Sequence, residues 1–364
     1  MNRTIFFFLG TEAELIKVFP VIIEAKNRGL DYRIIASGQN NIADSVIMKR
    51  GQFGKIDLEL SKESSIKKSA LGLFKWWIET YKTAKDKIEE TFPEVDFKNA
   101  DMVVHGDTVS TYMGAKIGNK LGMRVCHIEA GLRSHNLFSP FPEEIDRLLT
   151  SRLAVMHFAP GIEASENLKG VKGEVVNTNQ NTLIDSLDFS RNVPLEGELQ
   201  NVIQEEYFVF VMHRQENLAN KKFVSEVMEQ IVAASKNKKC VIILHEITKN
   251  TLKSMGLLNQ MQENSQMILL PRVDYFDFMK LLDAATYVIT DGGSNQEELY
   301  YMNKPCLIMR TTTERNEGLG ENARLFNGKA SDIGNFVKEY YTMRRVNTLA
   351  ESQPSKLIVD AMMR

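Results

Sequence analysis

Three carboxylates lie at expected junctions between strands and helices. Two of them follow apolar runs, and the third follows a proline. Asp107 comes directly after DMVVHG, Glu129 directly after RVCHI, and Glu143 directly after Pro142 at the start of an expected helix. Helix capping or a place in a first helical turn explains Asp107 or Glu143 taken singly. Glu129 resists that explanation, because an acid that ends a buried strand must be paired or used. Carboxylates that cluster and perturb one another suit general acid and base catalysis, which is the chemistry that we expect of the three together.

The second half of the chain offers groups that could hold a phosphate. His213 and Arg214 follow the apolar run YFVFVM, and a Gly-Gly-Ser turn at 292–294 follows YVITD just before an expected helix. Backbone N–H groups at a helix N-terminus form a natural diphosphate cradle, although an ordinary strand-to-helix turn has a similar sequence. Three further cations are open to two interpretations, as surface charges or as phosphate ligands: Lys17, Arg310 and Arg315.

The elements that must position these groups alternate along the chain. Apolar, β-rich runs of four to six residues are separated by longer amphipathic segments, which is the pattern of βαβ units and parallel sheets. In such sheets ligands bind beyond the carboxyl ends of the strands. We expect two doubly wound lobes, residues 1–175 and 176–351, with the crossover near 172–182. Residues 352–364 are expected to form one more helix, a candidate to pack back on the first lobe.

The segment from Ser65 to Glu90 predicts a long one-sided helix. Its apolar residues recur at three- and four-residue steps, with Trp76 and Trp77 alongside: Leu71, Phe74, Ile78, Tyr81 and Ile88. We interpret this stripe as core or dimer contact rather than as part of a cofactor site.

The composition excludes several classes of function. The chain has 364 residues and a formal net charge of -2, which provides no basic field for nucleic acid or for an anionic membrane. Its opening run, IFFFLG, is too short for a signal peptide or a membrane span, so we expect a cytoplasmic protein. Each cysteine lies in an apolar run, which predicts buried thiols in reducing surroundings: Cys126, Cys240 and Cys306.

Sequence motifs for bound cofactors are absent. The first apolar run is followed by a lone glycine, Gly10 in LGTEAEL, and not by GxGxxG, so dinucleotide chemistry is not expected. Neither GxxxxGK[ST] nor HExxH occurs, and the six histidines show no paired ligand spacing. We therefore expect no cofactor and no metal, and a small charged metabolite as the ligand.

Six blocks of the chain together resemble the motif series of the non-hydrolysing UDP-N-acetylglucosamine 2-epimerases: GTEAELIK, VHGDTVST, HIEAGLRSHNLFSPFPEEIDR, HRQEN, DGGSNQEE and TTTERNEG. Their order and spacing agree across nearly the whole chain, and the block from Val104 to Pro160 is the most specific. The resemblance implies an α/β, GT-B-like fold of two Rossmann-like, doubly wound parallel-sheet lobes with the active site in the cleft between them. It also implies a homodimer without metal or NAD that inverts C2 of UDP-N-acetylglucosamine to the manno form and supplies surface polysaccharide precursors.

The resemblance also implies the roles of individual residues. In this family UDP leaves as a proton is taken from C2, and both return to a glycal intermediate with C2 inverted. Asp107, Glu129 and Glu143 match the acid and base carboxylates, and His213 matches a histidine near the diphosphate. The remaining matches are expected to bind the UDP-sugar substrate: Gly10, Lys17, Arg133, Arg147, Phe278, Gly292, Gly293, Ser294, Glu298 and Arg315.

The sequence departs from the family pattern at three positions that matter. Glu12 stands where the family's GTRPE has an arginine, so a phosphate contact is lost. DGGSNQEE replaces DSGGIQEE, which moves the serine by two positions. SGQNN at 37–41 replaces TGQHR, in a region that, with a histidine matching His245, resembles an activating UDP-N-acetylglucosamine site of some bacterial members. These changes indicate a divergent branch, for which a modified N-acetyl sugar or a uronate is a candidate substrate.

Three other functions are compatible with the same residues. A hydrolysing relative would release UDP and free N-acetylmannosamine, although the intact PFPEEIDR and HRQEN segments favour the non-hydrolysing type. A GT-B glycosyltransferase would share the lobes but would need an acceptor. A catalytically silent binding protein would not need the carboxylate cluster.

Overall fold

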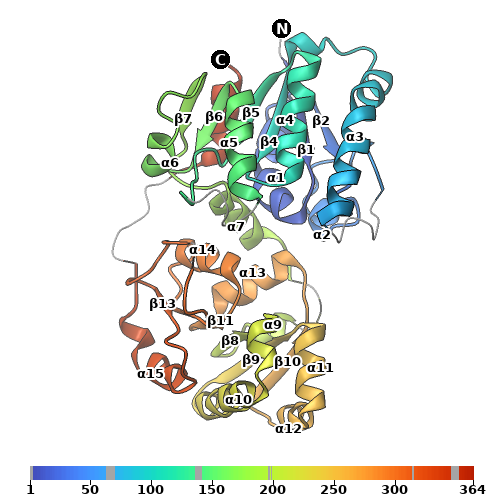
Figure 1. The fold of residues 1–364 in the computed structure, drawn as a ribbon. Coiled ribbons are helices and arrows are strands. Elements are labelled where there is room, and N and C mark those ends of the chain that lie inside the picture. The colour runs from blue at the N-terminus through green and yellow to red at the C-terminus, as the bar shows by residue number, and fades with distance from the viewer. Residues whose placement is uncertain are drawn as a thin grey trace. The chain divides into compact units, whose positions relative to one another are not determined.

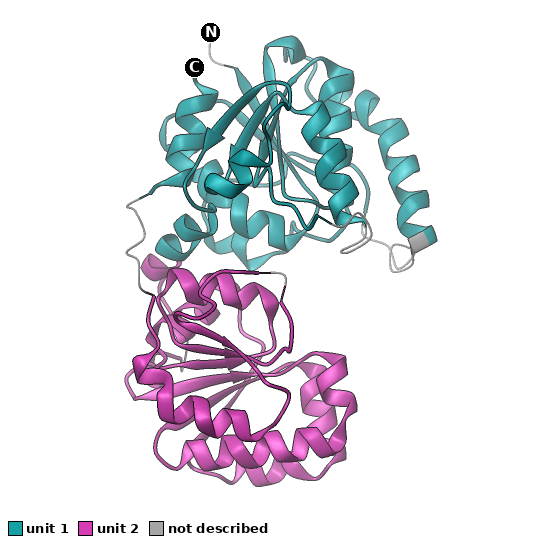
Figure 2. Ribbon diagram, turned by 60° about the vertical axis from the view of Figure 1, so that its left-hand side comes forward, with its two compact units in different colours: residues 1–189, 350–364 teal, residues 190–349 magenta. Residues whose placement is uncertain are grey.

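The computed structural model describes residues 3–62, 70–135, 142–195, 197, 199–313, 315–345 and 352–364. The chain divides into two compact units, each built on its own sheet (Figure 2). Unit 1 comprises residues 1–189 and 350–364, and unit 2 comprises residues 190–349.

The described part of unit 1 is built on a seven-stranded parallel sheet in the order β3-β2-β1-β4-β5-β6-β7 (Figure 1). Its central strands are buried along nearly their whole length, as in parallel sheets whose two faces are covered by helices. The strands are β1 (Thr4–Leu9), β2 (Tyr32–Ala36), β3 (Leu58–Glu59), β4 (Ala100–His105), β5 (Arg124–Ile128), β6 (Met156–Ala159) and β7 (Glu174–Asn177). The helices are α1 (Glu12–Asn27), α2 (Val46–Arg50), α3 (Ala70–Thr91), η2 (Phe97–Asn99), α4 (Val109–Leu121), α5 (Glu143–Leu153), α6 (Ile162–Glu166) and α16 (Pro354–Met362). Helix α7 (Leu183–Asn192) begins in unit 1 and ends in unit 2.

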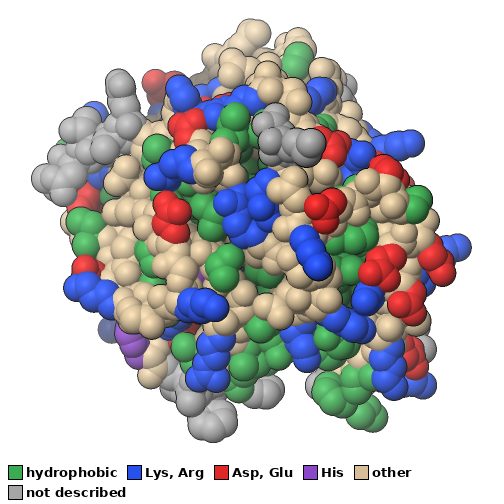
Figure 3. All heavy atoms as spheres, turned by 90° about the horizontal axis from the view of Figure 1, so that it is seen from above, with side chains coloured by type: hydrophobic (Ala, Val, Ile, Leu, Met, Phe, Trp, Pro, Cys, Tyr) green, Lys and Arg blue, Asp and Glu red, His purple; other side chains and the backbone are tan. Residues whose placement is uncertain are grey.

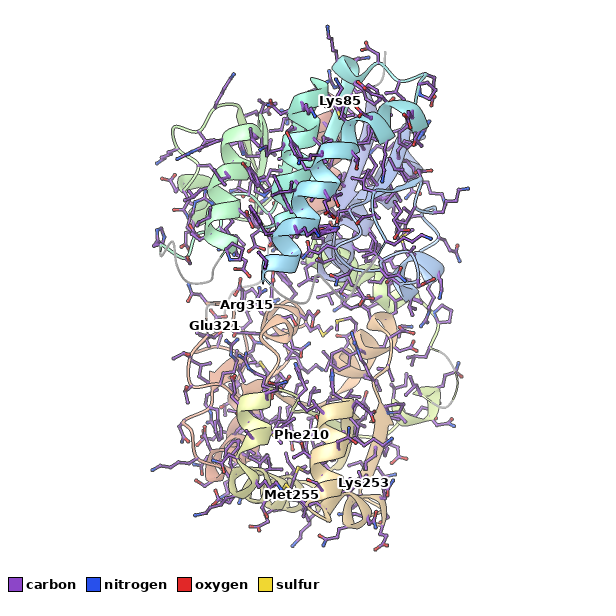
Figure 4. All side chains as sticks on the ribbon, turned by 45° about the vertical axis from the view of Figure 1, so that its right-hand side comes forward. Lys85, Phe210, Lys253, Met255, Arg315 and Glu321 are labelled. Atoms are coloured by element: carbon purple, nitrogen blue, oxygen red, sulfur yellow. The ribbon has the colours of Figure 1, made fainter. Side chains whose placement is uncertain are left out.

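In unit 2 the described residues form a six-stranded parallel sheet in the order β10-β9-β8-β11-β12-β13. Phe210, which Figure 4 labels, lies in its β8 strand and is fully buried. The strands are β8 (Tyr207–Val211), β9 (Lys239–Leu244), β10 (Met267–Pro271), β11 (Val288–Thr290), β12 (Cys306–Ile308) and β13 (Ala323–Leu325). The helices are α8 (Leu199–Val202), α9 (Gln215–Ala219), α10 (Lys221–Ser235), α11 (Glu246–Ser254), α12 (Leu257–Gln262), α13 (Tyr275–Ala284), α14 (Gly293–Tyr301), α15 (Ser331–Glu339) and η3 (Tyr340–Thr342).

The division between the units lies later in the chain than the expected boundary at 175/176. That boundary would cut β7, which pairs in parallel with β6 of unit 1, His157 lying opposite Val175. The strand that was expected to open the second series therefore closes the first sheet. Local sequence could not decide this, because an isolated apolar run does not indicate which sheet it joins.

Both sheets have the strand order of a doubly wound Rossmann-type fold, in which the chain reverses direction across the sheet at one point. In unit 1 this switch point lies between β1 and β4, and in unit 2 it lies between β8 and β11. Loops diverge at a switch point and leave a crevice that ligands use. The turns after these four strands carry Gly10, Asp107, His213 and Asp291, so the fold places predicted site residues at both crevices.

Small residues on α4 let this helix approach the unit 1 sheet closely. A Cβ atom on Gly114 would lie 2.6 Å from the Phe8 ring, and one on Gly118 would lie 2.6 Å from Met102 Cβ. The helix begins after Thr108, whose hydroxyl accepts the Ser110 and Thr111 N–H groups. Close packing and this cap together fix the turn that carries Asp107.

The apolar stripe of α3 divides between core and surface. Trp77 donates from Nε1 to the Val109 carbonyl at 3.0 Å and stacks on Tyr81 and Tyr112, and Ile88 is fully buried. Leu71 and Phe74, at the other end of the helix, are 80% and 62% exposed. The predicted helix is confirmed from Ala70 onward, and its first expected residues lie outside the described ranges.

The prediction that the cysteine side chains are buried is confirmed for all three residues. No helix among the described residues combines the length and the apolar character that a membrane span needs. On the face of the molecule drawn in Figure 3, lysine and arginine side chains are interspersed with aspartate and glutamate.

A buried ion cluster joins α16 to the amino-terminal end of the unit 1 sheet. Asp101 is fully buried and accepts hydrogen bonds from Arg3 Nε at 2.6 Å and from Arg124 Nε and Nη2 at 2.8 and 2.7 Å. Arg124 also donates to the Met362 carbonyl of α16 at 2.6 Å. One carboxylate thus holds two guanidinium groups, one of which holds the last helix.

We predict that Asp101→Asn lowers the free energy of unfolding by about 2 to 4 kcal/mol, because two partly buried cations lose their counter-charge. Urea denaturation of the variant measures the change. Asp86→Asn, an exposed acid on α3, is the matched control and should change stability by less than about 0.5 kcal/mol. Equal stabilities of the Asp101 and Asp86 variants would show that the cluster does not stabilise unit 1.

Candidate active site

The first turn of the unit 1 crevice is organised around Glu14. The Gly10 N–H donates to Glu14 Oε2 at 2.6 Å, and the Thr108 hydroxyl donates to Glu14 Oε1. Gly10 has no room for a side chain, because a Cβ atom would lie 2.1 Å from Ser110 Oγ. Gly10 therefore serves close packing, and its N–H is already engaged by a buried carboxyl.

Glu14 is a carboxyl that holds its proton up to near neutrality. Burial raises the pKa of Glu14 to about 7, and the hydrogen bonds from Thr108 and Gly10 oppose this only in part. The sequence reasoning assigned Glu14 no role, although its place four residues after Gly10, on the first helix, was a usable signal. Glu12, which replaces the expected arginine, accepts a hydrogen bond from Ser45 Oγ at 2.9 Å.

Asp107 is bound by Arg147, a residue of α5. Arg147 Nη2 donates to Asp107 Oδ2, and its Nη1 donates to Glu144 Oε2 at 3.1 Å. Burial would raise the pKa of Glu144, but the Ser134 N–H at 2.9 Å and the Arg147 guanidinium hold it below its ordinary value. Arg133 Nε lies 4.0 Å from Glu144 Oε1. The structure thus brings Asp107, Arg147 and Arg133 together, as the sequence implied, through Glu144.

Glu129 is the most tightly held of the predicted carboxylates. Its backbone has a positive φ of 61°, a left-handed conformation that costs a residue with a side chain about 1 to 2 kcal/mol. Lys17 Nζ and Asn181 Nδ2 both donate to Glu129 Oε2. Burial would raise the pKa of Glu129, but these contacts and the nearby His105 hold it well below its usual range. Glu129 is therefore an ionised carboxylate in a largely buried position.

The His105 imidazole lies beside this ion pair, and neither of its ring nitrogens has a hydrogen-bond partner among the described residues. Its Nε2 is 3.7 Å from Glu129 Oε2, and its side chain is 4% exposed. Burial lowers the pKa of His105 to about 4, and Glu129 opposes this shift. A neutral imidazole therefore adjoins the carboxylate.

Glu143 begins α5, as the sequence predicted. Its Oε2 atom is buried and has no hydrogen-bond partner among the described residues. The same holds for Oδ2 of Asp146, one turn further along the same helix. Residues 136–141, which precede α5 and belong to the most specific block, lie outside the described residues.

The crevice of unit 2 is organised around Asp291, which is fully buried. The N–H groups of His213 and Arg214 donate to Asp291 at 3.0 and 2.9 Å, and Asn217 Nδ2 donates at 3.0 Å. His213 Nδ1 lies 3.0 Å from Asp291 Oδ1, an ion-pair distance for a protonated imidazole. Burial would raise the pKa of Asp291, but the donors hold it below its ordinary value. The His213 ring also stacks on His245, with centroids 4.6 Å apart.

Helix α14 begins at Gly293, and no side chain caps its N-terminus. Ser294 is exposed there, so the turn presents N–H groups and a hydroxyl as the sequence predicted. Gly292 is required, because a Cβ atom would lie 2.4 Å from Asn295 Oδ1. Asn295 Nδ2 in turn donates to Glu298 Oε2 at 2.8 Å, which fixes the orientation of this buried carboxylate.

The loop between β12 and β13 is tied to α14. Gln296 donates to the carbonyls of Arg315 and Glu317 at 3.1 and 2.9 Å, and Arg315 Nη1 donates to Glu297 Oε2. Figure 4 labels Arg315 and Glu321, both from this loop. Phe278 lies half-buried on α13.

Residues that the sequence reasoning missed connect the predicted ones. Asn181 lies in the polar segment before α7, and this segment was interpreted from the sequence only as a crossover between the lobes. Its run of polar residues was the signal from which a role for Asn181 could have been predicted. Asp146 could have been found because it lies three residues after Glu143, and Glu144 because it lies three residues before Arg147. Residues three apart share a helix face. Within the described residues, no group of three or more His, Cys, Asp or Glu side chains is arranged to hold a metal ion.

We predict that Glu14→Gln flattens the dependence of stability on pH. Between about 4.5 and 7 the folded protein holds a proton that the unfolded chain has lost, so the stability from Glu14 is present at low pH and is lost as the pH rises. Glutamine has no titrating proton and can accept from the Gly10 N–H at any pH. The unfolding free energy of the variant, relative to wild type, should rise by about 2 to 3 kcal/mol from pH 4.5 to pH 8.

Urea denaturation at several pH values measures this difference. Glu163→Gln, at an exposed position of α6, serves as the control and should follow wild type throughout. A Glu14 variant that parallels wild type over the whole range would mean that Glu14 is ionised in the folded protein.

Comparison with known proteins identifies the chain's relatives. The family model for UDP-N-acetylglucosamine 2-epimerase matches residues 23–362. UDP-N-acetylglucosamine 2-epimerase of Methanococcus maripaludis is 30% identical and aligns over 97% of this chain and 96% of its own length.

Two solved structures resemble this one over the whole chain. The UDP-GlcNAc 2-epimerase of Methanocaldococcus jannaschii is 26% identical with a TM-score of 0.78, covering 100% of this chain and 99% of that chain. The Neisseria meningitidis enzyme bound to UDP-GlcNAc is 25% identical with a TM-score of 0.76 and the same coverage. The predicted fold of two Rossmann-like, doubly wound lobes is confirmed. The chain belongs to the UDP-N-acetylglucosamine 2-epimerase family.

Proposed function

We propose that this protein is an isomerase that inverts C2 of UDP-N-acetylglucosamine, or of a closely related UDP-N-acetyl sugar, by eliminating and re-adding UDP. The observation that carries the proposal is Glu129, an ionised and largely buried carboxylate at the carboxyl end of β5. An ionised carboxylate can accept a proton from a weakly acidic carbon only if the carboxylate oxygen is positioned against that C–H group. Membership of the family supplies the substrate class.

The proposed reaction needs an acid or base on each face of C2. In elimination the C2–H and C1–O bonds break and a C1–C2 double bond forms; the proton passes to a carboxylate and the C1–O electron pair leaves with UDP. Return of UDP and of a proton to the other face of C2 gives the epimer. We assign the proton transfers to Asp107, Glu129 and Glu143. Lys17 holds Glu129 in place, and Arg147 holds Asp107.

Unit 2 is proposed to hold the diphosphate. The uncapped N-terminus of α14 and the hydroxyl of Ser294 suit an anion, and His213, fixed by Asp291, could donate to the departing UDP. We assign ribose recognition to Glu298, whose orientation Asn295 fixes, and further substrate contacts to Arg133, Phe278, Gly292, Gly293 and Arg315.

A hydrolysing reaction is the second candidate, and one observation favours it. Glu12, bound to Ser45, occupies the place of the arginine that the family pattern puts on the diphosphate. A weaker hold on UDP would favour its escape before re-addition. The products distinguish the two candidates, because only hydrolysis gives free N-acetylmannosamine.

We further propose a cytoplasmic homodimer that supplies precursors for surface polysaccharides. Exposed Leu71 and Phe74 on α3 support a contact with a second copy. Buried, unpaired thiols support a reducing compartment.

Incubation with UDP-N-acetylglucosamine in deuterated water tests the proposal. We expect deuterium at C2 of both epimers, because the proton taken from C2 exchanges with solvent before re-addition; NMR and mass spectrometry of the products measure it. The absence of both isotope exchange and free UDP with every UDP-N-acetylhexosamine tried would contradict the proposal.

Variants of the three carboxylates refine the same experiment. Asp107→Asn, Glu129→Gln and Glu143→Gln should each lower the rate of exchange by about 100-fold or more without unfolding the protein. Asp86→Asn is the matched control and should exchange at the wild-type rate. Wild-type rates in all three carboxylate variants would remove the roles assigned above.

A further inference from the structure

The first turn of α5 and the adjoining β4–α4 turn bring four acids into one small region of unit 1. Glu143, Glu144 and Asp146 lie in the first turn of α5, and Asp107 is joined to the same helix through Arg147. Two guanidinium groups face them, those of Arg133 and Arg147. If every acid were ionised, two negative charges would remain without a counter-charge.

The two cations are engaged by only two of the four acids. Arg147 pairs with Asp107 and Glu144, and Arg133 lies near Glu144. Glu143 and Asp146 each keep a buried carboxyl oxygen without a hydrogen-bond partner in the described residues. Neighbouring carboxylates removed from water cannot both remain ionised without compensation, so one of this pair is expected to hold a proton.

Burial and position select Asp146 as the acid that keeps the proton. Asp146 is 6% exposed. Burial raises the pKa of Asp146 to about 7, and the negative charges of Glu143 and Asp107 contribute to this shift. Glu143, as the first residue of α5, gains more from the positive end of the helix dipole than Asp146 does at the fourth position.

Helix α4, which packs against α5, does not neutralise Asp146. It presents Tyr112, whose pKa is raised by burial and by Asp146, and Lys116, whose Nζ lies 5.6 Å from the centre of the Tyr112 ring. Among the described residues none forms an ion pair with Asp146. The proton is therefore its means of neutralisation.

We propose that Asp146 is a positioning residue of the reaction, which acts through Glu143: the site works while Asp146 is neutral and loses activity when Asp146 ionises. This inference rests on the proposed function. A neutral Asp146 leaves Glu143 and Asp107 free to exchange protons with the substrate. An ionised Asp146 adds an uncompensated negative charge beside both acids and so changes the proton affinity on which their roles as acid and base depend.

The ratio of kcat at pH 6 to kcat at pH 8 tests this role. Wild type should lose about tenfold in kcat over this interval, because Asp146 passes from mostly protonated to mostly ionised. Asp146→Asn, which is neutral at both pH values, should lose less than about threefold. Asp86→Asn, an exposed acid on α3, should keep the wild-type ratio. The same ratio in wild type and in Asp146→Asn would overturn the proposal.

An infrared measurement tests the protonation without relying on turnover. The infrared spectrum of wild type, after subtraction of the spectrum of Asp146→Asn, should show a carboxylic acid C=O band at pH 6 that disappears by pH 9. The absence of that band at pH 6 would overturn the proposal even if the variant folds poorly enough to lose activity. If wild type exchanges no C2 hydrogen of any UDP-sugar at any pH, the proposed function is wrong, and so is the role of Asp146 in that reaction. The infrared band still reports whether Asp146 is protonated, so the two failures can be told apart.

Discussion

A carboxyl group that is removed from water must be neutralised by a cation, by hydrogen-bond donors or by a proton, and the described residues of this protein include examples of all three. Glu129 receives a lysine and an amide, Asp291 receives backbone and side-chain donors, and Glu14 keeps a proton. The protonation states differ because the partners differ. Acid and base roles can therefore be divided among residues of the same type within one unit.

The strand order of the two sheets makes this arrangement available. Ends of neighbouring parallel strands meet at one edge, so Asp107 and Glu129, which follow the paired strands β4 and β5, lie at the same edge of the sheet. His213 and Asp291 meet in the same way after β8 and β11. Each crevice is thus assembled from turns that a doubly wound sheet must bring together.

Much of this could be predicted from the sequence, because strands and their ends leave local signals. The apolar runs before Asp107, Glu129 and His213 identified the strands, and a parallel sheet then placed the polar residues at one edge. The sheet that β7 joins could not be predicted, since pairing depends on contacts made elsewhere in the chain. The contact of Asn181 with Glu129 and the raised pKa of Asp146 could not be predicted either, because both depend on which side chains the fold removes from water.

The central proposal is that Asp107, Glu129 and Glu143 transfer the C2 proton of a UDP-N-acetyl sugar. A crystal structure with UDP-N-acetylglucosamine bound tests it most directly. We expect the diphosphate oxygens within hydrogen-bond distance of the Gly293 or Ser294 N–H group, and a carboxylate oxygen of Asp107, Glu129 or Glu143 about 3.5 Å from C2. A UDP-sugar whose C2 atom is remote from all three carboxylates would contradict it.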